Sequence, residues 1–75
     1  MSGPVVDALG TYCPVPIHLL ARALAGVPVG EVLEILADDP LIEVDLPAWC
    51  HATGHQLVAL SCDDGDYRGV VRRTR

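Results

Sequence analysis

The sequence contains no phenylalanine and no lysine, and Trp49 is its single tryptophan. Because aromatic residues make up only 4% of the chain, its core must be built from leucine, valine, isoleucine and alanine. Hydrophobic residues nevertheless account for 51% of the composition, which is enough to form a core and excludes intrinsic disorder. A chain of 75 residues is too short for two cores, so we expect residues 1–75 to form a single domain.

Positive charge is scarce: five arginines face ten carboxylates, and the formal net charge is −5. An acidic surface repels phosphate backbones, so direct binding of nucleic acid is not expected. Three of the arginines, Arg72, Arg73 and Arg75, lie close together near the C-terminus. They are interpreted either as a solubilising tail or as a small basic patch for an acidic partner protein.

Long apolar runs are also missing. No cationic segment precedes an apolar run at the N-terminus, so no secretory signal is expected. His18 and Arg22 interrupt the best candidate for a membrane span well short of about 18 apolar residues. The three cysteines, Cys13, Cys50 and Cys62, are odd in number and widely spaced, which does not fit a disulfide framework. We therefore expect a cytoplasmic protein with free thiols, and a monomer, as is usual for so small an acidic domain.

Apolar residues at helical spacing predict a first helix over residues 17–25. Its buried face is expected to consist of Ile17, Leu20, Ala21 and Leu24. His18 and Arg22 fall on the opposite face, one turn apart, where they are either solvated or part of a docking surface.

A second helix is expected to begin with Asp45 as its N-cap and to end at Gly54. Pro47 would then lie in the first turn, where its missing N–H group has no cost. Residues 41–44 are expected to form a separate helical turn before it. The side chains expected to face inward are Trp49 and Cys50.

Four strands are predicted over residues 5–9, 31–37, 56–61 and 67–73, and Asp64-Gly65 is a typical hairpin turn between the last two. The order of elements is β-α-β-α-β-β. It predicts a two-layer α/β sandwich in which both helices cover one face of a four-stranded mixed sheet.

Cys13 lies where the first strand leads into the first helix, within Cys13-Pro14-Val15-Pro16. With Pro14 at the first helical position, Cys13 would be the N-cap and its sulfur would lie beside the positive end of the helix dipole. Pro14 and Pro16 remove two first-turn N–H groups, so we expect a moderate lowering of the thiol pKa. The two prolines are also expected to hold the sulfur in a rigid loop.

The spacing around Cys13 excludes thioredoxin-type chemistry, because the position three residues on is Pro16 and not a resolving cysteine. A single sulfur is suited to carrying a sulfane sulfur as Cys–S–SH, which an acceptor thiolate can attack at the outer sulfur. The alternative is a non-catalytic regulatory or protein-binding module in which Cys13 is only a helix cap.

Other reactive side chains give weaker signals. Cys50, His51 and His55 lack a clear fourth ligand, and Gly54 is expected to end the helix before His55, so neither a metal nor another cofactor is predicted. Cys62 is expected to be packed or partly exposed in a strand. Asp38-Asp39 is most simply a turn, although Asp7 and Asp39 could shape the loops around Cys13.

The segment from Asp7 to Pro16, with sequence DALGTYCPVP, resembles the signature of the TusA/SirA-like sulfur carrier proteins. Residues 37–40, 45–50 and 54–57 resemble further family segments in the same order, and the likeness extends from Val5 to about Arg73. It implies the sandwich fold and a persulfide on Cys13.

The same resemblance implies partners. Sulfur would come from a cysteine desulfurase or a rhodanese-like donor and pass to proteins of tRNA thiolation or sulfur-compound oxidation. Arg22 corresponds to a basic residue that the family carries on its first helix. Tyr12 and Val15 depart from the residues often found beside the family cysteine, so the resemblance does not identify the partner.

Overall fold

The computed structural model describes residues 3–75, which form six elements: β1 (Val5–Asp7), α1 (Val15–Leu24), β2 (Val32–Ala37), α2 (Ile42–Thr53), β3 (Gln56–Asp63) and β4 (Asp66–Arg72). Met1 and Ser2 lie outside the described residues. The expectations of a single domain over residues 1–75 and of no secretory signal at the N-terminus both include these two residues.

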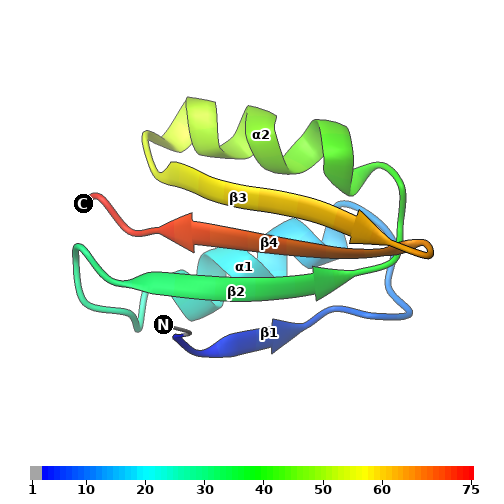
Figure 1. The fold of residues 1–75 in the computed structure, drawn as a ribbon. Helices are drawn as coiled ribbons and strands as arrows, with labels where there is room; N and C mark the ends of the chain where they lie inside the picture. The colour runs from blue at the N-terminus through cyan, green and yellow to red at the C-terminus, as the bar shows by residue number, and fades with distance from the viewer. Residues whose placement is uncertain (1–2) are drawn as a thin grey trace.

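The strands form one mixed sheet in the order β1-β2-β4-β3. β1 and β2 are parallel, whereas β4 pairs antiparallel with both β2 and β3. Because β2 and β4 run in opposite directions, the ends of β1 and β2, the start of β4 and the β3–β4 hairpin all lie at one end of the sheet (Figure 1). The start of each helix lies at this same end.

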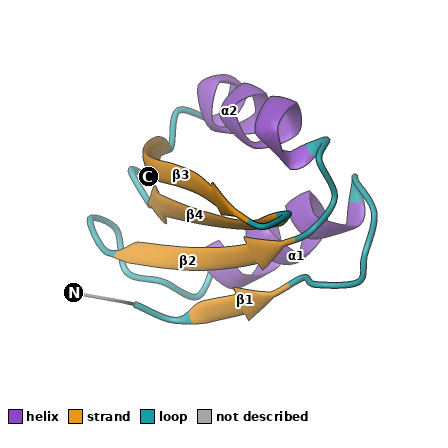
Figure 2. Ribbon diagram, turned by 45° about the vertical axis from the view of Figure 1, so that its right-hand side comes forward, coloured by secondary structure: helices purple, strands orange, loops and turns teal. Residues whose placement is uncertain are grey.

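Both helices cover one face of the sheet, as predicted, and the other face is open (Figure 2). The core between the layers is almost entirely aliphatic, as the lack of aromatic residues requires. Its fully buried side chains include Leu20 of α1, Leu33 and Ile35 of β2, Leu46 of α2 and Val71 of β4.

Gly69 in β4 allows α2 to pack close to the sheet. A Cβ atom at this position would lie 2.7 Å from Cδ2 of Leu46 and 3.1 Å from Cγ2 of Ile35. Both neighbours are fully buried core side chains, so neither can move aside without disturbing the packing around it. The missing side chain is therefore a packing requirement of the two-layer arrangement.

The predicted strands are confirmed with small shifts at their ends. Both Asp64 and Gly65 have positive φ, +53° and +84°, which confirms the expected tight hairpin turn. β1 ends at Asp7 and not at Leu9, because the Leu9 N–H group donates to Oδ1 of Asp7 at 3.1 Å and Gly10 turns the chain with a φ of +78°.

Helix α1 begins at Val15 with Pro14 as its N-cap, so the prediction that Cys13 is the N-cap is wrong. The first carbonyl of the helical pattern belongs to Pro14, which accepts the N–H of His18 at 3.1 Å. The buried face also differs from the expected one, since Ala21 is exposed and Pro16 is buried. Pro16, Leu20 and Leu24, four residues apart, form the centre of this face.

Helix α2 is continuous from Ile42, so the expected N-cap at Asp45 is wrong and Pro47 lies inside the helix. The helix starts earlier because Asp39 supplies acceptors there. The Leu41 N–H donates to Oδ1 of Asp39 at 3.1 Å, and the Ile42 N–H donates to the Asp39 carbonyl at 3.0 Å. The predicted end is confirmed, with Gly54 in the left-handed conformation.

The arginine-rich C-terminal segment contacts the end of the fold opposite the hairpin. Arg73 donates to the carbonyls of Ala25 and Val27 after α1, at 3.2 and 2.7 Å. Thr74 contacts the turn that follows α2, where its hydroxyl donates to the Gly54 carbonyl at 2.8 Å. Neither helix of the described chain has the length or the apolar run needed to cross a bilayer.

Replacing Gly69 by alanine is expected to destabilise the fold by about 1–3 kcal/mol, because the added methyl group overpacks the contact with Leu46. Urea unfolding followed by circular dichroism measures the change. The control is Gly26→Ala, whose Cβ would meet only the Ala23 carbonyl at 3.6 Å, an ordinary contact. Equal stability of Gly69→Ala and Gly26→Ala would contradict the packing argument.

Candidate functional site: the Cys13 loop

Cys13 lies in the loop between β1 and α1, at the hairpin end of the molecule, and its peptide bond to Pro14 is cis. Its side chain is partly buried and packs against the edge of the core. The Val15 N–H donates to the Tyr12 carbonyl at 2.9 Å, which closes a turn around the cysteine. The sulfur therefore lies beside the first turn of α1, between loop and core, and not at the capping position itself.

The carboxylate of Asp39 fixes the backbone of this loop. Its Oδ2 accepts the Cys13 N–H at 2.8 Å, while its Oδ1 accepts the N–H of Leu41 at the start of α2. Asp39 is only 9% exposed, so these hydrogen bonds replace those to water that burial removes. One buried carboxylate thus joins the loop before α1 to the loop before α2.

Two neighbouring aspartates support the same loop. Both carboxylate oxygens of Asp38 accept the Gly10 N–H at 3.1 Å, and Asp7 accepts the Leu9 N–H. The suggestion that Asp7 and Asp39 shape the loops around Cys13 is confirmed.

The thiol pKa of Cys13 is raised to about 11, so the expectation of a lowered pKa is wrong. Desolvation by burial contributes most, followed by the side chain of Asp45 and then by the charge of Asp39. Each of these disfavours the negatively charged thiolate of Cys13. The two prolines leave the helix start with few free N–H groups that could offset this effect. At pH 7 only about one Cys13 in 10⁴ is then a thiolate.

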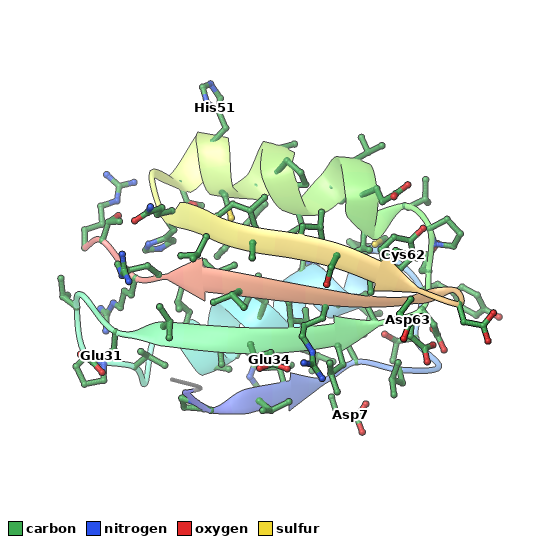
Figure 3. The ribbon with its side chains drawn as sticks, in the orientation of Figure 1. Asp7, Glu31, Glu34, His51, Cys62 and Asp63 are labelled. Atoms are coloured by element: carbon green, nitrogen blue, oxygen red, sulfur yellow. The ribbon has the colours of Figure 1, made fainter. Side chains whose placement is uncertain are left out.

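Further carboxylates lie at the same end of the molecule as the Cys13 sulfur. Eight of the ten acidic residues lie at the hairpin end with Cys13, among them Asp7 and Asp63 in Figure 3. The eight are Asp7, Asp38, Asp39, Glu43, Asp45, Asp63, Asp64 and Asp66. The C-terminal arginines lie at the opposite end, so the molecule is strongly polarised.

The structure brings Pro14 and Pro16 to Cys13 but leaves Arg22 apart. Pro14 is the exposed N-cap and Pro16 is a buried residue of the first turn. Arg22 is exposed in the last turn of α1, about 10 Å along the helix axis from its first residue. Arg22 is not among the charges that shift the pKa of the Cys13 thiol.

Asp45 is the site residue that sequence reasoning missed, because it was interpreted as a helix cap. The available signal was its position: four acidic residues, Asp38, Asp39, Glu43 and Asp45, follow the second predicted strand, whose end lies beside the end of the first in a parallel pair.

Comparison with known proteins agrees with this fold and loop. Residues 5–73 match the family model described as sulfurtransferase TusA. The chain belongs to the TusA family. It is therefore a sulfur carrier, a kind of protein that takes sulfur from one protein and gives it to another.

Individual TusA-family relatives cover nearly the whole chain. A candidate sulfur carrier protein of Archaeoglobus fulgidus is 39% identical over 71 residues, which are 95% of this chain and 97% of the relative. The sulfur carrier protein TusA of Pseudomonas savastanoi pv. phaseolicola is 33% identical, over 92% of this chain and 82% of its own.

Among solved structures, the SirA-like protein of Desulfitobacterium hafniense superimposes with a TM-score of 0.81 at 27% identity. The match covers 97% of this chain and 100% of that protein. The predicted two-layer α/β fold of this TusA-family chain is thereby confirmed.

The remaining cysteines and histidines of this TusA-family chain do not converge on one point. Cys50 is buried, and burial raises its pKa. His51 points away from α2 into solvent (Figure 3), whereas the His55 ring lies 5.6 Å from that of Trp49 and accepts the Thr74 N–H at 3.1 Å. Within residues 3–75, no three histidine, cysteine, aspartate or glutamate side chains form a group that could hold a metal ion.

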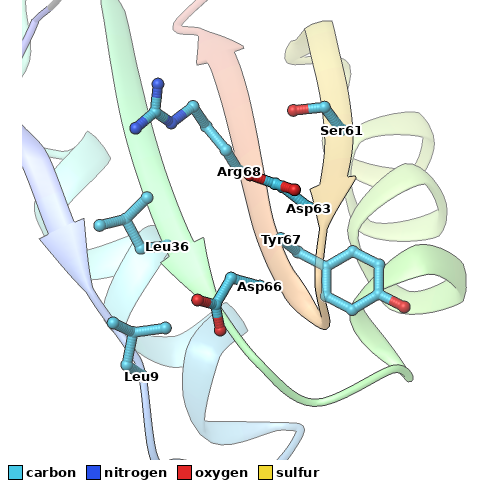
Figure 4. Close-up of a pocket in the computed structure, with 7 residues that line it drawn as sticks. All are labelled: Leu9, Leu36, Ser61, Asp63, Asp66, Tyr67 and Arg68. Carbon is cyan, nitrogen blue, oxygen red and sulfur yellow. The ribbon is translucent and has the colours of Figure 1, made fainter.

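Cys62 is exposed on β3, and a separate hollow of about 450 Å³ lies on the open face of the sheet (Figure 4). Leu9, Leu36, Ser61, Asp63, Asp66, Tyr67 and Arg68 line the hollow. Arg68 at its side pairs with Glu34 at 2.8 Å. Cys13 is not part of this lining, so the hollow is distinct from the sulfur site.

The rate of alkylation of Cys13 by iodoacetamide is expected to rise about tenfold per pH unit until pH approaches 11, because only the thiolate reacts. Peptide mass spectrometry after timed quenching separates Cys13 from Cys62 and measures both rates. A Cys13 rate that levels off below pH 9 would contradict the electrostatic description of the site.

Replacing Asp39 by alanine is expected to destabilise the fold by about 1–3 kcal/mol, because the N–H groups of Cys13 and Leu41 lose their acceptor. Urea unfolding measures the loss. Asp38→Ala removes an exposed carboxylate and serves as the matched control, with a smaller effect. If the two variants are equally stable, Asp39 does not hold the two loops together.

Proposed function

We propose that Cys13 receives a sulfane sulfur as a persulfide, Cys13–S–SH, and passes it to a partner protein. The observation that carries this proposal is a single cysteine on a fixed loop, between β1 and α1, in a TusA-family chain. Position 16 is a buried proline, so no local thiol can displace the sulfur from Cys13. A persulfide formed there would persist until an acceptor thiol arrives.

The residues around Cys13 hold its loop in place but do not make its thiol more reactive. Asp39 holds the Cys13 backbone, and Pro14 and Pro16 restrict the loop and the helix start that follow it. Because a protonated thiol is a weak nucleophile, Cys13 in its resting state is poorly reactive toward small electrophiles. Sulfur transfer therefore depends on a partner that docks and orders the reacting sulfurs.

The donor we propose is a cysteine desulfurase or a rhodanese-like protein, and the acceptor belongs to tRNA thiolation or to sulfur-compound oxidation. Eight carboxylates at the sulfur end favour partner proteins with basic surfaces there, whereas they disfavour direct contact with nucleic acid. Arg22, exposed and far from the sulfur, is proposed only as a docking residue. Relay between thiols requires a reducing compartment, so we place this monomeric relay in the cytoplasm.

Incubation with a cysteine desulfurase, its pyridoxal phosphate and cysteine is expected to add about 32 Da to the chain, and a reducing agent should remove the added mass. Intact-mass spectrometry detects the gain, and peptide mapping assigns it to Cys13.

The matched variants are Cys13→Ser, which should gain no mass, and Cys62→Ser, which should load like the parent because Cys62 lies elsewhere on β3. Loading of Cys13→Ser would overturn the assignment to Cys13. A parent chain that never loads from any sulfur donor would instead favour the regulatory or binding module. Slow alkylation is expected in both cases and does not separate them.

A further inference from the structure

A second hollow lies at the end of the molecule opposite Cys13, where both helices finish and the C-terminal segment contacts them (Figure 1). Its volume is about 160 Å³, which is smaller than the cavities that hold cofactors or drug-sized ligands. Its lining includes Leu24 and Ala25 at the end of α1, Trp49 of α2, His55 of the following turn, and Arg73 and Arg75. A space of this size suits a single side chain or one small anionic group.

The C-terminal arginines are not an unattached tail. Arg73 donates to two carbonyls after α1, and its Nε donates to the Arg75 backbone oxygen at 3.0 Å. The Thr74 N–H donates to Nδ1 of His55 at 3.1 Å. These hydrogen bonds hold the segment against the ends of both helices, so one wall of the hollow is fixed in place. Of the two interpretations of the arginine-rich end, the structure therefore favours a basic patch over a solubilising tail.

The four polar side chains that line the hollow are all hydrogen-bond donors. Because Nδ1 of His55 accepts the Thr74 N–H, the neutral ring carries its proton on Nε2. Burial, and then the charges of Arg75 and Arg73, lower the pKa of this ring, which keeps it neutral at pH 7. Within residues 3–75, no hydrogen bond links an acceptor to this N–H, to the Trp49 indole N–H or to the Arg75 guanidinium. The complement of such a lining is a group that only accepts hydrogen bonds.

The positive charge at the hollow is not neutralised by acidic side chains of the fold. Among residues 3–75, the one ion pair joins Arg68 to Glu34 on the open face of the sheet. Glu31, just before β2, is the only other acidic side chain outside the hairpin end, and no ion pair joins it to Arg73 or Arg75 (Figure 3). An anion from another molecule would therefore meet guanidinium groups that have no carboxylate partner.

The apolar walls of the hollow favour a carboxylate that is carried on a hydrocarbon stem. Leu24, Ala25 and the ring of Trp49 supply apolar surface, which gains from contact with methylene groups and gains nothing from a hydrated inorganic anion. Guanidinium groups match the two oxygens of a carboxylate. Arg22, exposed in the last turn of α1, adds positive charge at the same end of the molecule. The surface thus fits a segment that carries several acidic side chains.

We propose that the basic hollow formed by Trp49, His55, Arg73 and Arg75 is a docking site for a glutamate or aspartate side chain in an acidic segment of a partner protein. The site lies at the opposite end from Cys13, so a partner held there leaves the sulfur free to meet a second protein. The proposal goes beyond sulfur transfer and does not require that Cys13 carries a persulfide.

The test uses the whole chain and a hexaglutamate peptide with blocked ends. Trp49 is the reporter, because it is the only tryptophan and lines the hollow. At low ionic strength the peptide is expected to change the Trp49 fluorescence in a saturable way, whereas hexaglutamine should cause no change. Arg75→Gln should weaken binding about tenfold, because it removes a guanidinium from the hollow. This variant is preferred to Arg73→Gln, since the Arg73 side chain also holds the fold together.

Arg68→Gln is the matched control, because it removes the same charge from the open face of the sheet, away from the hollow. Its affinity for the peptide should stay within a factor of about two of the parent's. No saturable binding by the parent, or equal affinities of Arg75→Gln and Arg68→Gln, would overturn the proposal.

Two further measurements separate the acidic segment from other ligands of the hollow. Inorganic phosphate should bind more weakly than the peptide, and equal affinity would assign the hollow to a free anion instead. Sedimentation equilibrium should show no self-association; association that Arg75→Gln abolishes would assign the hollow to the acidic end of a second copy. Saturating peptide should leave the rate of Cys13 alkylation by iodoacetamide unchanged, and a slower rate would contradict the separation of the two sites.

Discussion

A single buried carboxylate organises this molecule. Asp39 accepts one N–H from the loop before α1 and another from the start of α2, and it is only 9% exposed. Because both donors are backbone groups, loss of the carboxylate would leave two N–H groups without their acceptor, at a larger cost than loss of one exposed hydrogen bond. The position of the Cys13 loop and the point where α2 begins are therefore set by the same contact.

This arrangement has an electrostatic consequence. Burial of the thiol, together with the carboxylates of Asp45 and Asp39 near it, raises its pKa to about 11, so the resting cysteine is held as a thiol. For a carrier this is useful, because an unloaded protein then reacts slowly with adventitious electrophiles and oxidants. If Cys13 carries the sulfur as proposed, its reactivity then comes from contact with the partner and not from a preformed thiolate.

The charges on the surface of the molecule are also unevenly distributed. Eight carboxylates gather at the end that carries Cys13, while Arg72, Arg73 and Arg75 lie at the other end. Such a separation of charge produces a long-range electric field along the molecule, which salt screens. Arg73 also donates hydrogen bonds to two carbonyl groups beyond the end of α1. These bonds hold the C-terminal segment against the fold.

Periodicity and turn residues were sufficient to predict the order of the six elements, the Asp64-Gly65 hairpin and the end of α2 at Gly54, because these features depend on neighbours in the chain. The DALGTYCPVP segment also singles out Cys13, whose role as the carrier of sulfur stays a prediction. The start of α2 and the raised thiol pKa could not be predicted in this way. They depend on Asp39 and Asp45, which lie 26 and 32 residues beyond Cys13 in the sequence and reach it only when the parallel β1–β2 pair brings the two loops together.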